Sequence, residues 1–141
     1  MDRKPFVGTW RLESFEGRGE DGEVSYLSGG KVAGLLAYDE KGNMIVQVVN
    51  QGRPRFASGA MRCGTPDEIK AAFEGNIAYF GTYDVDEEKR VVVHHVTGCS
   101  FPNWVGVDNT RSFCFSGDRL TLTTPDVDGQ GTARLVWERI R

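Results

Sequence analysis

The stretch GLLAYDEKGNMIVQVVN, residues 34–50, decides the fold class of this chain. Two short segments, 34–38 and 44–50, flank the turn-forming cluster Asp39-Glu40-Lys41-Gly42-Asn43, in which Gly or Asn can adopt a positive φ. Met44, Val46 and Val48 share one face of the second segment, because successive side chains of a strand point to opposite faces. The stretch therefore predicts an antiparallel β-hairpin with one apolar face.

The same pattern recurs along the chain. Residues 78–85 are predicted to pair with residues 90–96, and residues 112–115 with residues 120–124, across short polar turns. Residues 9–15 form a half-buried first strand and residues 134–140 the last one, with a loop rich in glycine and acidic residues at 17–22. Eight or nine strands joined mostly by tight turns favour an all-β, closed up-and-down antiparallel barrel over a sandwich, which needs longer Greek-key connections.

One segment departs from the strand pattern. Thr65-Pro66-Asp67-Glu68 combines an N-cap threonine, a proline at the first helical position and a glutamate that completes a capping box. A helix of two to three turns is expected to follow, to about Phe73 or Glu74. Ile69, Ala72 and Phe73 share a face of it, so we expect the helix to cover or plug one end of the barrel.

Composition limits the classes of protein to which the chain belongs. Its 141 residues, 39% hydrophobic and 26% charged, suit one globular domain spanning 1–141. The net charge of −3, spread along the chain, makes a nucleic-acid partner unexpected. There is no apolar run of membrane-spanning length and no apolar leader segment near the N-terminus, so we expect a cytoplasmic protein without a membrane partner. Three widely spaced cysteines suggest neither a disulfide framework nor a zinc site.

Several motifs resemble those of a known family. Gly8-Thr9-Trp10 at the head of the first strand resembles the lipocalin signature, and the segments 6–12, 34–38, 79–83, 94–96, 101–106 and 117–122 together resemble the small stand-alone lipocalin-like domain proteins of bacteria and fungi. The resemblance runs nearly end to end. It implies that Trp10 lies across the closed end of the barrel and that a basic side chain of the last strand, Arg139 or secondarily Arg134, stacks on it. It transfers no particular reaction.

His94 and His95 are the two histidines of the chain, and alternation places them on opposite faces of their strand. If Val92, His94 and Val96 form the interior face, His94 is the candidate catalytic acid or base, or a group that orients a ligand. The alternative is a hydrogen-bonded core histidine beside Tyr79 or Tyr83. Metal binding is not expected, because adjacent histidines on a strand cannot chelate one ion together.

Further side chains are candidates for a ligand site within the barrel. Tyr79 and Tyr83 share a strand face, and Arg111 shares one with Phe113, so a phenol or a guanidinium could hold the polar end of a ligand. The alternatives are tyrosines that pack in the wall and an Arg111 that forms an exterior salt bridge. Trp104, in the bulky segment 101–104, is either part of a lid at the barrel mouth or folded against the barrel exterior.

Three functions remain open. The first is binding of a small hydrophobic or aromatic molecule, with the predicted ligand contacts Met44, Val46, Tyr79, Tyr83, His94, Trp104, Arg111 and Phe113. The second is an isomerase or cyclase of secondary metabolism that uses His94 as acid or base, with Tyr79 or Arg111 stabilising negative charge. The third is a barrel filled by its own side chains that serves in assembly. Nothing in the sequence requires an enzyme or a cofactor, and the oligomeric state stays open.

Overall fold

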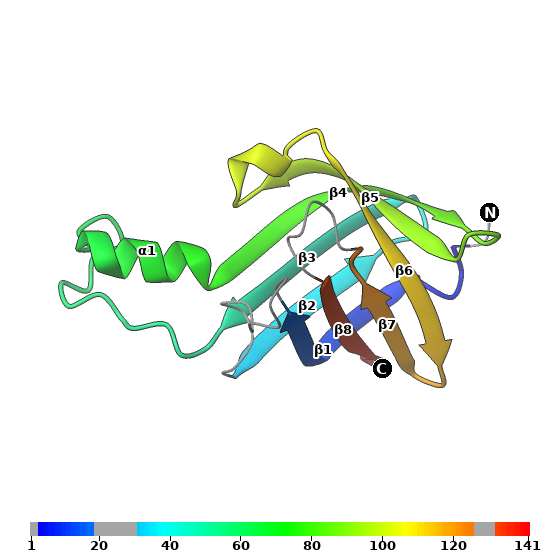
Figure 1. The fold of residues 1–141 in the computed structure, drawn as a ribbon, viewed down its shortest axis with the longest axis horizontal. Coiled ribbons are helices and arrows are strands. Elements are labelled where there is room, and N and C mark those ends of the chain that lie inside the picture. Colours follow the sequence, from blue (N-terminus) through cyan, green and yellow to red (C-terminus); the bar gives the residue numbers. More distant parts are fainter. Residues whose placement is uncertain (1–2, 19–30, 126–131) are drawn as a thin grey trace.

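The computed structural model describes residues 3–18, 31–125 and 132–141, and in them eight antiparallel strands close into one barrel (Figure 1). Each strand pairs with the next along the chain, and the last pairs with the first. The closed up-and-down barrel with one short helix is thereby confirmed. The elements are β1 (Gly8–Arg18), β2 (Val32–Tyr38), β3 (Asn43–Asn50), α1 (Pro66–Glu74), β4 (Asn76–Asp86), β5 (Val91–Cys99), a 3-10 turn η1 (Pro102–Trp104), β6 (Asp108–Ser116), β7 (Arg119–Thr123) and β8 (Thr132–Arg139).

The β2–β3 hairpin forms as its turn chemistry predicts. The Asp39 carboxylate accepts hydrogen bonds from the backbone N–H groups of Lys41 and Asn43, at 2.9 and 2.8 Å, and Gly42 adopts a φ of +95°. This turn fixes the register in which Tyr38 lies opposite Met44. Positions 44, 46 and 48 are consequently buried, whereas positions 43, 45 and 47 are exposed.

The β4–β5 hairpin bends at a glycine. The register shifts between Phe80, which pairs with Gly98, and Gly81, which pairs with Val96, and this shift marks a β-bulge near the C-terminal end of β5. A Cβ atom added at Gly81 would lie 1.9 Å from the backbone oxygen of His95, so no other residue fits there without movement of the backbone. The bulge thus lets the barrel wall curve beside the two histidines.

The two ends of the barrel differ. At the closed end, tight turns join β2 to β3, β4 to β5 and β6 to β7. Longer connections, including α1 and η1, leave the opposite end, which we call the mouth (Figure 1). Apolar side chains toward the mouth are only partly buried against the core, namely Phe15, Val32, Ile77, Cys99, Trp104 and Leu135.

A tryptophan under an arginine seals the closed end. Trp10 is fully buried, and the guanidinium carbon of Arg139 lies 4.2 Å from the centroid of its ring. The same guanidinium donates hydrogen bonds of 2.7 Å to the backbone oxygens of Val7 and Pro5, and the Trp10 indole N–H donates to the Phe6 oxygen at 2.9 Å. The last strand therefore ties the N-terminal segment across the barrel floor.

The helix begins at its predicted capping box but lies elsewhere than expected. The Thr65 hydroxyl accepts from the Glu68 N–H at 3.2 Å, and the Glu68 carboxylate accepts from the Thr65 N–H at 2.8 Å. The prediction that α1 covers or plugs the barrel is wrong: α1 projects from the mouth end (Figure 1), and Ile69 and Phe73 are 51% and 48% exposed. Only Gly75 separates α1 from β4, and the helix continues outward from that strand (Figure 1).

The predicted glycine-rich loop begins later than expected. Gly17 and Arg18 belong to β1 and pair with Ala133 and Thr132 of β8, so the strand continues through the start of the predicted loop. The remainder of that loop, 19–22, lies outside the described residues. Within the described part of the chain, α1 and η1 are both too short to span a membrane.

Candidate functional site

The two neighbouring histidines of β5 face opposite sides of the barrel wall. His94 is 2% exposed and points inward, in the same face as Val92 and Val96. On the outer surface, His95 lies between two carboxylates, with Nδ1 2.7 Å from Asp108 and Nε2 2.8 Å from Asp84. These two hydrogen bonds raise the pKa of His95 above its usual value. The candidate interior group is therefore His94.

His94 is held between two tyrosines. Its Nε2 atom lies 2.6 Å from the hydroxyl oxygen of Tyr38, and its Nδ1 atom lies 2.7 Å from the hydroxyl oxygen of Tyr79. Burial lowers the pKa of His94 to about 3, and the positive charge of Arg111 acts in the same direction. Burial also raises the pKa of both tyrosines. All three groups are thus neutral near neutral pH.

Counting the hydrogen atoms that His94, Tyr38 and Tyr79 share shows that one hydroxyl hydrogen is left for a further hydrogen bond. A neutral imidazole has one N–H donor and one acceptor nitrogen, so one phenol donates to His94 and the other accepts from it. The accepting phenol keeps an O–H hydrogen that His94 does not take. Tyr79 lies nearer the mouth, 6.0 Å ring to ring from Trp104, whereas Tyr38 packs against Phe6 of the closed end.

Two polar side chains of β6 complete the interior group. Asn109 and Arg111 share the inward face of that strand with the buried Phe113. Both lie close enough to the Tyr79 oxygen to oppose part of the rise that burial produces in the pKa of Tyr79. Asn109 is 7% exposed, and its amide nitrogen Nδ2 is buried without a hydrogen-bond partner among the described residues. We call Tyr38, Tyr79, His94, Asn109 and Arg111 the polar cluster.

An unpartnered buried amide is unusual, because most buried polar groups in proteins are hydrogen-bonded. The Trp137 indole nitrogen of β8 is also buried and unpartnered, but it lies between apolar neighbours of β1 and β7. Asn109 differs because it adjoins a phenol and a cation. An oxygen atom placed there would accept from Nδ2 and from its neighbours at once.

The remaining predicted ligand contacts divide between the wall and the closed end. Met44 and Val46 are buried in the wall formed by β3, and Val46 lies opposite Tyr79. Tyr83 is also inward, but its hydroxyl donates to the backbone oxygen of Asp39 at 2.7 Å, at the closed end. Phe113 packs edge-on against Phe6 at 4.9 Å. Tyr83 and Phe113 therefore pack at the closed end of the barrel. For Tyr83 this agrees with the alternative in which the tyrosines pack in the wall.

The segment around Trp104 forms the short 3-10 turn η1 beside the mouth. Trp104 is partly buried against the core, with its ring edge-on to Tyr79 and 5.9 Å from Phe101. Phe101 in turn contacts Phe73 of α1, with ring centroids 6.4 Å apart. The aromatic segment thus links the base of the helix to the interior.

Sequence reasoning missed two members of the polar cluster. Tyr38 lies at the end of the predicted strand 34–38, two positions after Leu36, and the alternation alone could have placed it inward. Asn109 lies before the predicted pairing segment 112–115, whereas β6 begins at Asp108 in the structure. Extending the alternation of Phe113 and Arg111 back by two residues would have found it.

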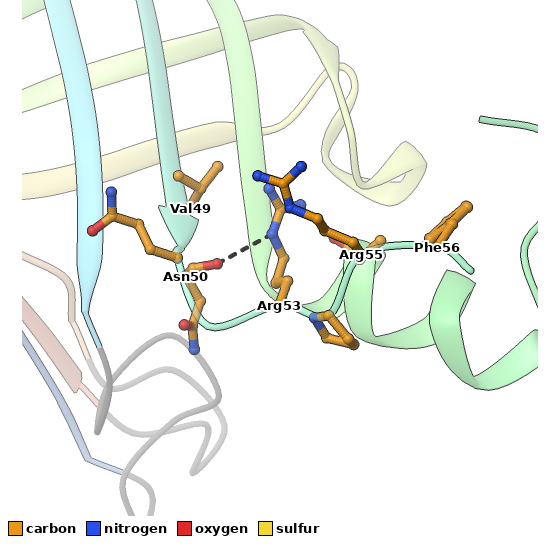
Figure 2. A pocket seen from close by; sticks show the side chains of 8 residues that line it. Val49, Asn50, Arg53, Arg55 and Phe56 are labelled. Atoms are coloured by element: carbon orange, nitrogen blue, oxygen red, sulfur yellow. Dashed lines mark hydrogen bonds between the residues drawn. The ribbon is translucent and has the colours of Figure 1, made fainter. Parts of the chain in front are cut away.

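Two surface hollows lie on the outside of the molecule, and the second of them includes Val46 and Tyr79 in its lining. One, of about 460 Å³, separates the end of β3 from α1 and is lined by Asn50, Arg53, Arg55 and Phe56 among others (Figure 2). In it the Arg53 side chain donates to the Asn50 backbone oxygen at 3.2 Å. The other, of about 340 Å³, lies over β3, β4 and the end of β5, where Phe80 is exposed. In the described parts of the chain, no group of three or more acidic, histidine or cysteine side chains is arranged to hold a metal ion.

Comparison with known proteins agrees with this architecture. The profile of the lipocalin-like domain matches residues 7–140. The chain belongs to the lipocalin-like domain family. A relative from Aspergillus oryzae (strain ATCC 42149 / RIB 40), the 4'-hydroxy-3'-methoxypropiophenone carrier protein ppsC, is 32% identical over 87 residues, which cover 57% of this chain and 78% of the relative.

Solved structures similar to this lipocalin-like barrel are more distant in sequence. Wild-type fluorescent protein UnaG is 15% identical, with a TM-score of 0.44, over 99% of this chain and 100% of UnaG. Secretory abundant heat soluble protein 4 of Ramazzottius varieornatus is 18% identical, with a TM-score of 0.47, over 98% of this chain and 96% of that protein.

Proposed function

We propose that this lipocalin-like barrel binds one small aromatic molecule in its interior, with a ligand oxygen held at the polar cluster. The observation that carries the proposal is the buried, unpartnered Nδ2 atom of Asn109 beside Tyr79 and Arg111. Apolar walls with a few convergent polar groups are typical of small-molecule sites. The partly buried apolar side chains of the mouth provide the route and the contact surface for the arene.

The relative from Aspergillus oryzae supports an aromatic ligand. Its name describes a carrier of an aryl ketone that also has phenol and methoxy oxygens. Such a molecule combines a flat apolar ring with hydrogen-bond acceptors, which suits the apolar wall and the Nδ2 donor of Asn109. A binding role is also supported by His94, because both of its ring nitrogens are engaged and its pKa of about 3 leaves no proton to give near neutral pH.

Calorimetric titration with 4'-hydroxy-3'-methoxypropiophenone tests the proposal directly. We expect one molecule bound per chain, and a dissociation constant raised about three- to tenfold by Asn109→Leu, the effect of losing one hydrogen bond of typical strength. Gln47→Leu, on the exposed outer face of β3, is the control and should bind as the wild type does. If neither this ketone nor unsubstituted propiophenone binds, the proposal fails.

A further inference from the structure

The interior of the barrel contains a positive charge without a negative partner. Arg111 points inward from β6 and is only partly exposed. Within the described residues, no carboxylate forms an ion pair with it, whereas Arg3, Arg119 and Arg141 each have one. The guanidinium donates one hydrogen bond, of 3.1 Å, to the backbone oxygen of Thr110. It also acts on the Tyr79 hydroxyl, and since an arginine carries five N–H donors, some of its donors remain available.

The neighbours of Arg111 do not balance this charge. The raised pKa values of Tyr38 and Tyr79 keep both phenols protonated, and His94 contributes no charge of either sign near neutral pH. Asn109 is uncharged, and its unpartnered atom is the donor Nδ2. The polar cluster therefore has a net charge of about +1 in a largely apolar barrel, where unpaired charges are unfavourable.

We propose that the ligand of this barrel is an organic anion, whose negatively charged oxygen is held jointly by Arg111 and Asn109. The inference rests on the proposed binding function and adds the charge of the ligand to it. A carboxylate, or an ionised phenol or enol, supplies the missing negative charge and accepts from the Asn109 Nδ2 atom as well. Hydrogen bonds between ionised partners are shorter and stronger than those between neutral ones, so the anionic form is selected over a neutral ester or ether.

The arrangement also places an aromatic surface beside the anion site. The Trp104 ring lies edge-on to Tyr79, and Tyr79 lies next to both Asn109 and Arg111. A ligand whose anionic group is attached directly to an arene can therefore contact the guanidinium and the Trp104 surface together.

Two fluorescent probes that differ by one anionic group test the proposal. The first is 1-anilinonaphthalene-8-sulfonate, and the second is the neutral N-phenyl-1-naphthylamine, which has the same aromatic skeleton without the sulfonate. We expect the wild-type protein to bind the sulfonate at least tenfold more tightly at neutral pH. In Arg111→Gln that ratio should fall to near one, because the sulfonate binds more weakly while the affinity for the neutral probe stays within about twofold.

Two more variants separate a specific charge effect from damage to the fold. Arg111→Lys keeps the charge without the planar guanidinium and should retain an intermediate preference for the sulfonate. Arg11→Gln removes an exposed arginine from the outer face of β1 and should leave both affinities unchanged. Circular dichroism at the titration temperature establishes that each variant is folded.

The outcomes distinguish this inference from the function on which it rests. If the wild type binds both probes equally, or if Arg111→Gln retains the full preference, the ligand is not selected as an anion and only the inference is overturned. If Arg11→Gln loses the preference as Arg111→Gln does, the sulfonate binds the general surface charge and the inference is again overturned. If the wild type binds neither probe, the interior does not accept arenes, and the inference and the proposed function fail together.

Discussion

The buried imidazole of His94 should make the stability of this protein depend on pH in a defined window. The pKa of His94 falls from its ordinary value near 6.5 to about 3 in the folded chain, mainly through burial. Below about pH 6.5 the unfolded chain therefore binds a proton that the folded chain does not. His94 then contributes stability in full above that pH, and the contribution is lost progressively as the pH falls toward 3.

The magnitude follows from the two pKa values. With an unfolded pKa of about 6.5 and a folded pKa of about 3, linkage predicts that the free energy of unfolding decreases by about 1 kcal/mol between pH 6 and pH 5 through His94 alone. Most carboxylates are still ionised in that window, so they contribute little to the change. Urea unfolding at closely spaced pH values, followed by tryptophan fluorescence, resolves a difference of this size.

His94→Gln is the variant that isolates the contribution of His94 to the pH dependence of stability. An amide can donate to one phenol and accept from the other, so it retains the contacts with Tyr38 and Tyr79 but does not titrate. We expect that the free energy of unfolding of the variant no longer decreases by about 1 kcal/mol between pH 6 and pH 5, whatever its absolute stability. An unchanged decrease in His94→Gln would refute the assignment of a neutral, buried imidazole, and with it the argument against His94 as an acid.

His95→Gln is the matched comparison, because the pKa of His95 is shifted upward whereas that of His94 is shifted downward. The hydrogen bonds to Asp108 and Asp84 raise the pKa of His95, so its contribution is present below the unfolded pKa and is lost as the pH rises through the folded pKa. His95→Gln should therefore flatten the alkaline side of the stability profile above about pH 6.5 and leave the acid side as in the wild type.

Three further predictions concern the fold. Arg139→Met should lower the free energy of unfolding by about 2–3 kcal/mol in urea, because it removes the cation over Trp10 and two hydrogen bonds to the N-terminal segment. Thr65→Ala should speed amide hydrogen exchange in α1 about fivefold with little change in global stability, because the helix lies outside the barrel. Gly81→Ala should lower the thermal midpoint severely or prevent folding, since its Cβ would collide with the His95 oxygen.

Each of these predictions has a matched control. Arg141→Met removes an exposed arginine of the same end and should leave the urea midpoint unchanged. Thr65→Ser keeps the capping hydroxyl and should exchange as the wild type does. Gly52→Ala, in an exposed turn where a Cβ meets only a side-chain oxygen at 3.2 Å, should fold normally. A control that behaves like its partner variant would show that the effect does not come from the contact named.

The sequence predicts best the elements that are determined by interactions between residues close together in the chain. The β2–β3 hairpin depends on Asp39 and Gly42 in the turn and on alternation beside it, all within a few residues. The capping box of α1 is equally local. The position of the helix is not local, because it depends on the direction in which β4 leaves Gly75. Propensity and capping contain no information on that direction, so the expected cover over the barrel was wrong.

The candidate site was predictable only where apolar alternation marks the strand. His94 could be placed inward because Val92 and Val96 flank it at a spacing of two. Asn109 is polar and lies before the apolar part of β6. The alternation of apolar residues by which a strand is recognised therefore does not reach it. Polar side chains in a barrel interior interrupt the apolar alternation that marks inward-facing positions. The five residues of the polar cluster therefore could not be grouped from the sequence alone.

The composition of the polar cluster also separates the three functions considered for this chain. A barrel that serves only in assembly is stabilised best by apolar interior side chains, since burying polar and charged groups is unfavourable unless they are fully paired. Arg111 and Asn109 are not fully paired among the described residues. An enzyme that uses His94 as acid or base requires a titratable nitrogen facing the substrate, whereas both nitrogens of His94 contact tyrosines. Those contacts leave the imidazole to orient Tyr79 beside Asn109 and Arg111, and this arrangement is the one on which the proposed binding of a ligand oxygen rests.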